Sequence, residues 1–251
     1  MHAAPRAGIV ARVTRPSTFI LVHGAWHGAW CWHRLIPLLE ASGARVIAPD
    51  LPAMGADATP PESVTLESWA RFVAGLAEHE PGCRVVGHSR AGAIISRAAE
   101  LAPRSIGQLV YLSAYLLRGG DSVAAEARRD GGSLIAANMV ASRSGVTCAL
   151  RPEVLREAFY GDCSDQDFAL AVAHLSPEPL KPLATPLRVT DEGFGSVARH
   201  YIETMRDRAV SLEAQRRMQS ALPCASTATL DAGHSPFLSQ PEALARILIS
   251  I

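Results

Sequence analysis

The chain has 251 residues, of which 48% are apolar and only 19% charged, so it can bury a large core and is not expected to be disordered. The 24 basic residues balance the 24 acidic ones, which argues against nucleic acid or an anionic membrane surface as a partner. The five cysteines are odd in number and have no C-x-x-C spacing, so neither a disulfide framework nor a zinc site is expected.

The N-terminal segment, residues 1–16, carries three arginines and no apolar run long enough for a secretory signal. We expect it to be a loose extension. No run elsewhere approaches the length of a membrane span, so a soluble, cytoplasmic protein is expected. Since α/β folds of this length are commonly one domain, residues 1–251 are predicted to form a single domain.

Short β-branched runs alternate with longer helical stretches, which is typical of a parallel sheet covered by helices. In chain order, the expected strands are residues 18–22, 45–48, 84–86, 108–112, 200–204 and 227–230. The expected helices between them are residues 30–41, 65–80, 90–102, 212–221 and 241–249. Most of the strands are nearly continuous apolar runs, as in strands that are buried on both faces. The pattern predicts an α/β fold with a mainly parallel sheet of about six strands.

The stretch over about residues 119–190 interrupts this alternation. It holds two Gly-Gly pairs, several prolines, and amphipathic pieces at residues 154–159 and 166–174. A long insertion between two sheet strands is usually functional. We therefore expect a helical cap, inserted before the last two strands and covering the carboxyl ends of the strands.

The strongest local motif is Val-Val-Gly-His-Ser-Arg-Ala-Gly, which ends at Gly92 and contains Ser89. A β-type run leads into Ser89 and an Ala-rich helix leads away, so the serine hydroxyl should project from a sharp turn at the top of the sheet. The usual pattern is G-x-S-x-G, and here Ala91 takes its last position. A turn that merely ends a strand is the alternative, but the strand-to-helix context favours a nucleophile. The backbone N–H of Arg90 is expected to stabilise an oxyanion.

A second oxyanion donor should follow the first core strand. That strand ends in His23-Gly24-Ala25, and the N–H of Ala25 is the expected donor. His23 is expected to be structural. Packing or loop roles are likewise expected for three further histidines, His27, His33 and His88.

The general base should follow the last strand, and His234 does so. Histidine suits this role because its pKa lies near working pH. Asp207, after the preceding strand, is the expected acid that orients the imidazole. Glu203 and Asp191 compete with it, whereas Asp231 is disfavoured because it lies too near His234 in the same loop. The order Ser, Asp, His is that of the α/β-hydrolases.

Several segments resemble a known family. They are FILVHGAWHGAWCW (residues 19–32), VIAPDLPAMG (46–55), GHSRAG (87–92), AFYGDCSDQD (158–167), YIETMRDRAVSLEAQRRM (201–218) and DAGHSPFLSQPEAL (231–244). They are similar to the plant methyl-ester esterases and hydroxynitrile lyases of the α/β-hydrolase superfamily, and to their bacterial esterase relatives. The resemblance implies a triad of Ser89, Asp207 and His234, with Ala25 and Arg90 as oxyanion donors. It also implies that no cofactor is used and that a homodimer is possible.

Two departures from the lyases favour ester hydrolysis. The lyases of this branch carry Lys directly after the catalytic histidine, where this chain has Ser235, and a hydroxyl residue where this chain has Ala25. Arg90 is unusually large and charged for its position. Its side chain is expected to face solvent or pair with an acid. A sharper hypothesis is that it reaches the pocket and selects an anionic substrate.

The sequence thus predicts a serine carboxylic-ester hydrolase that acts on a small, largely apolar ester through an acyl-enzyme intermediate. No metal site is expected, and beyond the possible homodimer the predicted partner is a small-molecule substrate. The alternatives are a cofactor-free C–C bond hydrolase or lyase, a lactonase, and a non-catalytic small-molecule receptor. The candidate pocket residues, each of which is more often plain packing, are Trp26, Phe159, Tyr160, Phe168 and Leu170.

Overall fold

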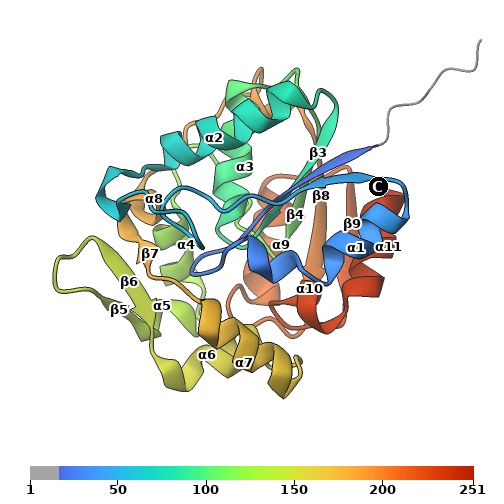
Figure 1. The fold of residues 1–251 in the computed structure, drawn as a ribbon. Helices are drawn as coiled ribbons and strands as arrows, with labels where there is room; N and C mark the ends of the chain where they lie inside the picture. Colours follow the sequence, from blue (N-terminus) through green and yellow to red (C-terminus); the bar gives the residue numbers. More distant parts are fainter. Residues whose placement is uncertain (1–16) are drawn as a thin grey trace, which may run out of the picture.

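The computed structural model describes residues 17–251, so the extension expected over residues 1–16 lies outside the described part. A six-stranded sheet forms its centre, with strand order β2-β1-β3-β4-β8-β9 and every neighbouring pair parallel (Figure 1). The strands are β1 (Thr18–Val22), β2 (Arg45–Ile47), β3 (Cys83–His88), β4 (Ile106–Leu112), β8 (Ala198–Thr204) and β9 (Ser226–Leu230). The predicted α/β class and strand number are confirmed.

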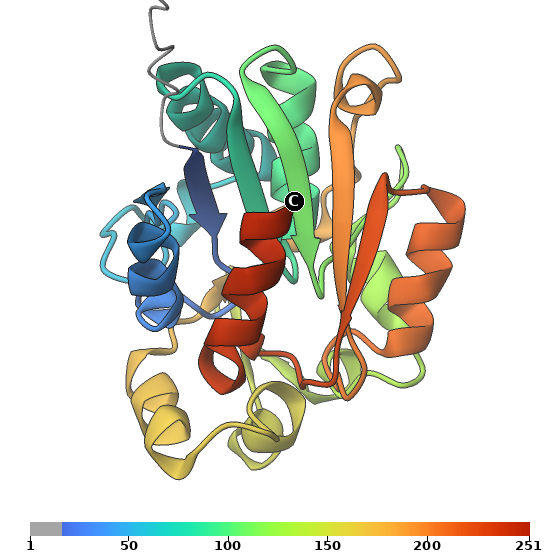
Figure 2. The same cartoon turned by 90° about the vertical axis from the view of Figure 1, so that its right-hand side faces the viewer.

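The register brings the carboxyl ends of the central strands to one edge of the sheet. Val22 of β1 lies opposite Gly87 of β3, which in turn lies opposite Tyr111 of β4. Figure 2 shows the strand arrows pointing toward the cap. All five residues of β1 are buried, as expected for a strand covered on both faces.

Helices cover both faces of the sheet (Figures 1 and 2). On one face α1 (Leu35–Ala41) packs against α11 (Pro241–Ser250), and on the other α2 (Leu66–His79) packs against α3 (Ala91–Leu101). The remaining sheet-covering helix, α9 (Leu212–Ala221), packs on β8.

The start of α2 follows its predicted capping pattern. The N–H of Ser68 donates to Thr65 Oγ1 at 3.0 Å, and the N–H of Thr65 donates to Ser68 Oγ at 2.8 Å. These reciprocal bonds satisfy backbone donors that the first helical turn leaves without partners.

The single helix expected over residues 30–41 is instead a 3-10 turn, η1 (Ala29–Trp32), followed by α1. Pro37 explains the break, because it has no N–H to donate to residue 33 and its ring would clash with that carbonyl. With the helix beginning at Leu35, Pro37 falls in the first turn, where no donor is needed.

The cap lies between β4 and β8, as predicted. It comprises α4 (Val123–Arg129), α5 (Ile135–Asn138), β5 (Met139–Ala141), β6 (Thr147–Leu150), α6 (Pro152–Phe159), α7 (Asp165–His174), β7 (Glu178–Pro179) and α8 (Leu180–Ala184). Beside its helices the cap contains a feature that the sequence did not indicate, a three-stranded antiparallel sheet of β5, β6 and β7. Strands of two to four residues are too short to show the two-residue alternation by which a sequence reveals a half-buried strand.

Three short elements complete the described chain: η2 (Pro61–Ser63), η3 (Phe194–Ser196) and α10 (Pro236–Ser239). The five cysteines are all free thiols, and four of them are buried. Within residues 17–251, no helix has both the length and the apolarity needed to span a membrane.

Candidate active site

Ser89 occupies the sharp turn between β3 and α3 with a φ of 55°, in the left-handed region that non-glycine residues seldom adopt. Its N–H donates to the carbonyl of Leu112, and its own carbonyl accepts from the N–H groups of Gly92 and Tyr115, all at 3.0–3.1 Å. Such a conformation persists when the surrounding bonds over-determine it, and it is concentrated at functional sites. The turn holds Ser89 at the carboxyl end of the sheet, as the motif predicts.

Two glycines make this turn possible, and they explain why Ala91 is tolerated. A Cβ on Gly92 would collide with the carbonyl oxygen of Tyr115, and one on Gly87 would lie 2.8 Å from Ile95 Cδ1. The close backbone approach therefore falls on Gly92, one residue after the position where the usual pattern has glycine.

The loop after β1 lies directly against Ser89. A Cβ on Gly24 would be 3.1 Å from Ser89 Cβ and 2.7 Å from His88 Nδ1, so a side chain at this position would force its neighbours to shift. The backbone N–H groups of Ala25 and Arg90 have no hydrogen-bond partner among residues 17–251, and both residues border the same cavity as Ser89. Two unpaired amides beside a serine hydroxyl are the arrangement needed to hold an oxyanion.

His234 and Asp207 meet in the loops that follow β9 and β8. Asp207 Oδ2 lies 2.7 Å from His234 Nδ1, and both side chains are almost completely buried. An ionised carboxylate only accepts hydrogen bonds, so Nδ1 carries the proton and Nε2 is left with its lone pair. This is the tautomer that a general base requires.

The Asp207 carboxylate is itself fixed by further donors. Oδ1 accepts from the N–H groups of Ala209 at 2.7 Å and Val210 at 2.8 Å, and Oδ2 accepts from Thr204 Oγ1 at 3.0 Å. These bonds hold the carboxylate plane in a single orientation toward the imidazole.

The competing acids are engaged elsewhere. Glu203 pairs with Arg216 at 2.8 Å, and Asp231 pairs with Arg206 at 2.9 Å. Asp191 is exposed ahead of η3. Of the four acids considered from sequence, Asp207 is the one bonded to His234.

Buried histidines surround the site as neutral structural groups. His88 Nε2 donates to the carbonyl of His234 at 2.9 Å, and the His27 ring bonds both Ala25 O and the hydroxyl of Tyr160 at 2.7 Å. Burial lowers the pKa of His27 to about 4 and that of His88 well below its ordinary value. They therefore brace the backbone at Ala25 and His234 without placing positive charge beside the His234 ring.

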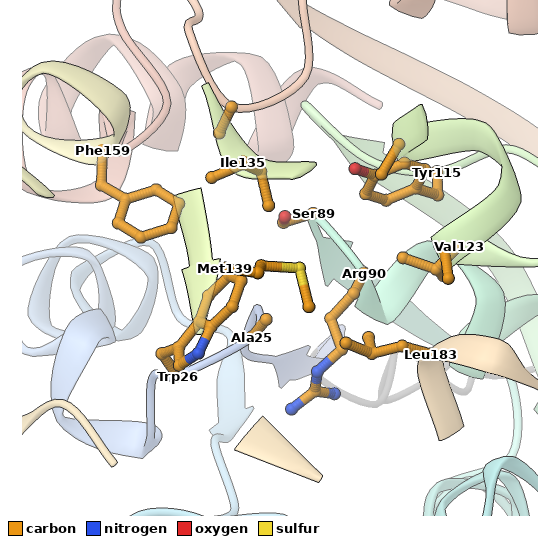
Figure 3. A pocket seen from close by; sticks show the side chains of 13 residues that line it. Ala25, Trp26, Ser89, Arg90, Tyr115, Val123, Ile135, Met139, Phe159 and Leu183 are labelled. Carbon is orange, nitrogen blue, oxygen red and sulfur yellow. The ribbon is translucent and has the colours of Figure 1, made fainter. Parts of the chain in front are cut away.

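A small apolar cavity of about 40 Å³ opens beside Ser89 (Figure 3). Of the candidate residues, Trp26 and Phe159 border it. Residues not anticipated from sequence complete the wall: Tyr115, Val123, Ala124, Ala127, Ile135, Met139, Leu183 and Ala209. Most come from cap elements or the loops next to them, whose packing against the sheet edge has no signal in local sequence.

The prediction that Tyr160, Phe168 and Leu170 line the pocket is wrong for this cavity. Tyr160 is completely buried, with its hydroxyl turned to His27. Phe168 packs on Tyr160 and under the guanidinium of Arg156. The aromatic cluster thus supports the cap rather than contacting the cavity.

The Arg90 side chain was expected either to face solvent or to pair with an acid. It is buried and pairs with an acid. Its Nε lies 2.5 Å from Glu178 Oε1 of β7, and its guanidinium stacks 4.2 Å over the ring of Trp69. Figure 3 shows the guanidinium directed away from the Ser89 hydroxyl. A cation neutralised in this way offers little to an anionic substrate.

No cluster of His, Cys, Asp and Glu side chains within residues 17–251 is arranged to hold a metal ion.

Comparison with known sequences supports one family. Residues 19–247 match the model of the alpha/beta hydrolase family. The chain is 32% identical to putative methylesterase 11, chloroplastic, of Arabidopsis thaliana, with all of this chain and 67% of that protein covered. It is 30% identical to methylesterase 7 of the same plant, with 93% and 95% covered. The chain spans only about half the length of two other chloroplastic relatives, putative methylesterases 13 and 15.

Solved structures agree with this relationship. Methylketone synthase I of tomato, complexed with 2-tridecanone, has a TM-score of 0.84 at 25% identity, covering 94% of this chain and 98% of that one. The pyrethroid hydrolase PytH has a TM-score of 0.81 at 29% identity, covering 94% and 97%. The chain therefore belongs to the alpha/beta hydrolase family, in which its sequence relatives include methylesterases.

Proposed function

We propose that the protein is a serine carboxylic-ester hydrolase that acts on a small, largely apolar ester through an acyl-enzyme intermediate. The observation that carries the proposal is the 2.7 Å bond between Asp207 and a buried His234 at the sheet edge where Ser89 sits in a left-handed turn. The methylesterase relatives support the same class of reaction.

In this mechanism Ser89 Oγ attacks the ester carbonyl while His234 Nε2 takes its proton. The N–H groups of Ala25 and Arg90 stabilise the oxyanion, and Asp207 stabilises the imidazolium. His234 then protonates the leaving alcohol. It next removes a proton from water, which hydrolyses the acyl-enzyme.

The cavity supports a neutral substrate with a compact apolar group. Its lining is mostly apolar, with polar groups on Ser89, Arg90, Tyr115 and Trp26, and it is about 40 Å³ in volume. The Arg90 guanidinium, which would favour an anionic substrate, is already paired with Glu178. Neutral esters with a short acyl chain are therefore the expected substrates.

A second candidate is a lyase or C–C bond-cleaving reaction, favoured by the likeness to methylketone synthase I. Two residues argue for hydrolysis instead. Ser235, next to the base, is uncharged and fully buried, and Ala25 brings no hydroxyl to the oxyanion loop. Neither the charged group nor the hydroxyl of the hydroxynitrile lyases is present.

The test is turnover of p-nitrophenyl acetate and butyrate compared with a β-keto acid and a cyanohydrin. We expect rapid hydrolysis of the esters, covalent labelling by a fluorophosphonate probe, and loss of both in Ser89→Ala. Full esterase rate in Ser89→Ala would exclude the serine mechanism. A purified protein that is neither labelled nor active on any substrate would favour the receptor alternative.

A further inference from the structure

Trp26, the residue that follows the oxyanion donor Ala25, has a left-handed backbone with a φ of 62°. For a bulky residue this conformation is strained and must be held by its surroundings. Here the holding bonds come from the cap. The Trp26 N–H donates to Glu178 Oε2 at 3.0 Å, its indole N–H donates to Cys148 O at 3.1 Å, and its carbonyl accepts from Ser176 N–H at 2.9 Å.

Glu178 also bonds the second oxyanion residue. Its carboxylate pairs with Arg90 Nε at 2.5 Å and lies 3.4 Å from Arg90 Nη2. One carboxylate in β7 thus contacts Arg90, whose backbone N–H is one oxyanion donor, and the peptide adjoining Ala25, which supplies the other. Glu178 does not border the cavity, so it does not contact a bound substrate there.

This ion pair is poorly suited to stabilising the fold. Glu178 is 0% exposed and the Arg90 side chain 2% exposed. Burial raises the pKa of Glu178 and lowers the pKa of Arg90, so each pays a desolvation cost that the mutual attraction only partly offsets. Buried ion pairs of this kind are often replaced by apolar residues without loss of stability. Its position between the two donor segments indicates a role other than stability.

We propose that Glu178 is a positioning residue for the oxyanion hole, which it holds from the cap through the Trp26 amide and the Arg90 side chain. The inference rests on the proposed serine-hydrolase function. It predicts that Glu178 affects the transition state, where charge develops on the carbonyl oxygen, more than it affects substrate binding.

Three variants test this role: Glu178→Gln, the double variant Arg90→Met/Glu178→Met, and the matched control Glu126→Gln. In Glu178→Gln the amide oxygen of the new side chain can still accept from Trp26 N–H, whereas the double variant removes both charges and that acceptor. Glu126 is a comparably buried cap carboxylate, paired with Arg217 at 2.5 Å and not bonded to the oxyanion loop.

The readouts are kcat and KM on p-nitrophenyl butyrate, the Ki of an arylboronic acid, and the melting temperature. A boronic acid forms a tetrahedral serine adduct, so its affinity reports on the oxyanion hole. Removing one oxyanion donor outright costs about 10²- to 10³-fold in kcat. Displacing the two donors should therefore lower kcat about 10- to 100-fold in the double variant, with KM within about threefold. Boronic-acid affinity should weaken in parallel, and Glu178→Gln should lie between the double variant and the wild type.

The control Glu126→Gln should keep kcat and Ki near wild type even if its melting temperature falls. A double variant with wild-type kcat and Ki would overturn the inference. So would a loss of kcat in the control that matches the loss in the Glu178 variants. Failure of the hydrolase assignment would appear separately, as esterase activity that survives Ser89→Ala.

Discussion

The substitution Asp207→Asn tests how the structure sets the tautomer of the base. Two backbone donors, the N–H groups of Ala209 and Val210, point at Oδ1 from 2.7 and 2.8 Å. An asparagine must place its carbonyl oxygen there, because an amide NH₂ would face two donors. Its NH₂ would then occupy the Oδ2 position and donate to His234 Nδ1. The proton of His234 would move to Nε2, and the imidazole could no longer accept the proton of Ser89.

The size of the effect follows from that tautomer change. An imidazole held in the wrong tautomer, with geometry otherwise intact, lowers kcat by about 10⁴-fold in a Ser-His-Asp site. This factor corresponds to about 5.4 kcal/mol of lost transition-state stabilisation. We expect Asp207→Asn to lose kcat by this order on p-nitrophenyl butyrate. Its fold should persist, since the bonds to Ala209 and Val210 remain.

The matched control is Asp231→Asn. The Asp231 carboxylate is 74% exposed and pairs with Arg206, and it lies three residues before His234 in the chain. This variant should retain wild-type kcat. The reasoning would be refuted if Asp207→Asn kept a tenth or more of wild-type kcat while its crystal structure showed the amide oxygen toward the two backbone donors.

Three further substitutions or conditions give clear expectations. Gly24→Ala would place a Cβ 2.7 Å from His88 Nδ1 and 3.1 Å from Ser89 Cβ; the displaced nucleophile should cost about 10- to 100-fold in kcat, measured on the ester used above. Ile135→Ala would widen the cavity, so kcat/KM should shift toward longer acyl chains by about fourfold per added methylene, measured over p-nitrophenyl esters from acetate to octanoate. The pKa of His27 is about 4 in the folded protein, whereas its ordinary value is 6.5. Between pH 4 and pH 6.5 the unfolded chain therefore binds more protons than the folded protein does. The free energy of unfolding should therefore be highest above pH 6.5 and fall by about 1.4 kcal/mol per pH unit below it from His27 alone; urea titrations at several pH values should show a shallower fall in His27→Gln.

The central strands of the sheet could be predicted from sequence because they are mostly buried, as in β1, whereas the edge strands β2 and β9 are largely exposed or half-buried. The run at residues 18–22 is a continuous apolar or β-branched segment, and the structure extends or trims the six predicted strands by at most two residues at either end. The positions of Ser89, Asp207 and His234 follow from the same sheet, since Ser89 directly follows β3 and the other two lie in the loops that begin where β8 and β9 end.

The structure of the cap was harder to predict from sequence because it depends on long-range packing. Its sheet pairs Cys148 with Glu178, thirty positions apart, and one of its strands is only two residues long. From sequence alone, a charged residue such as Glu178 is expected on the solvated surface. The structure instead places Glu178 in the interior against Arg90, which lies 88 positions away in the chain. Such a pairing leaves no periodic signal in either segment.

The contacts made by the cap argue that it is part of the catalytic apparatus as well as a substrate cover. Asp162, between α6 and α7, accepts the N–H of Gly233 at 2.8 Å and so holds the residue next to His234. Glu178 holds the residue next to Ala25 at 3.0 Å. The base loop and the oxyanion loop are therefore each anchored by a carboxylate of the inserted segment, acting on a backbone amide one residue from the reacting group. A cap exchanged for another that lacks both acids should consequently lower kcat for every ester, whereas a cap that only shaped the pocket would change the relative rates among esters and leave the best substrate fast.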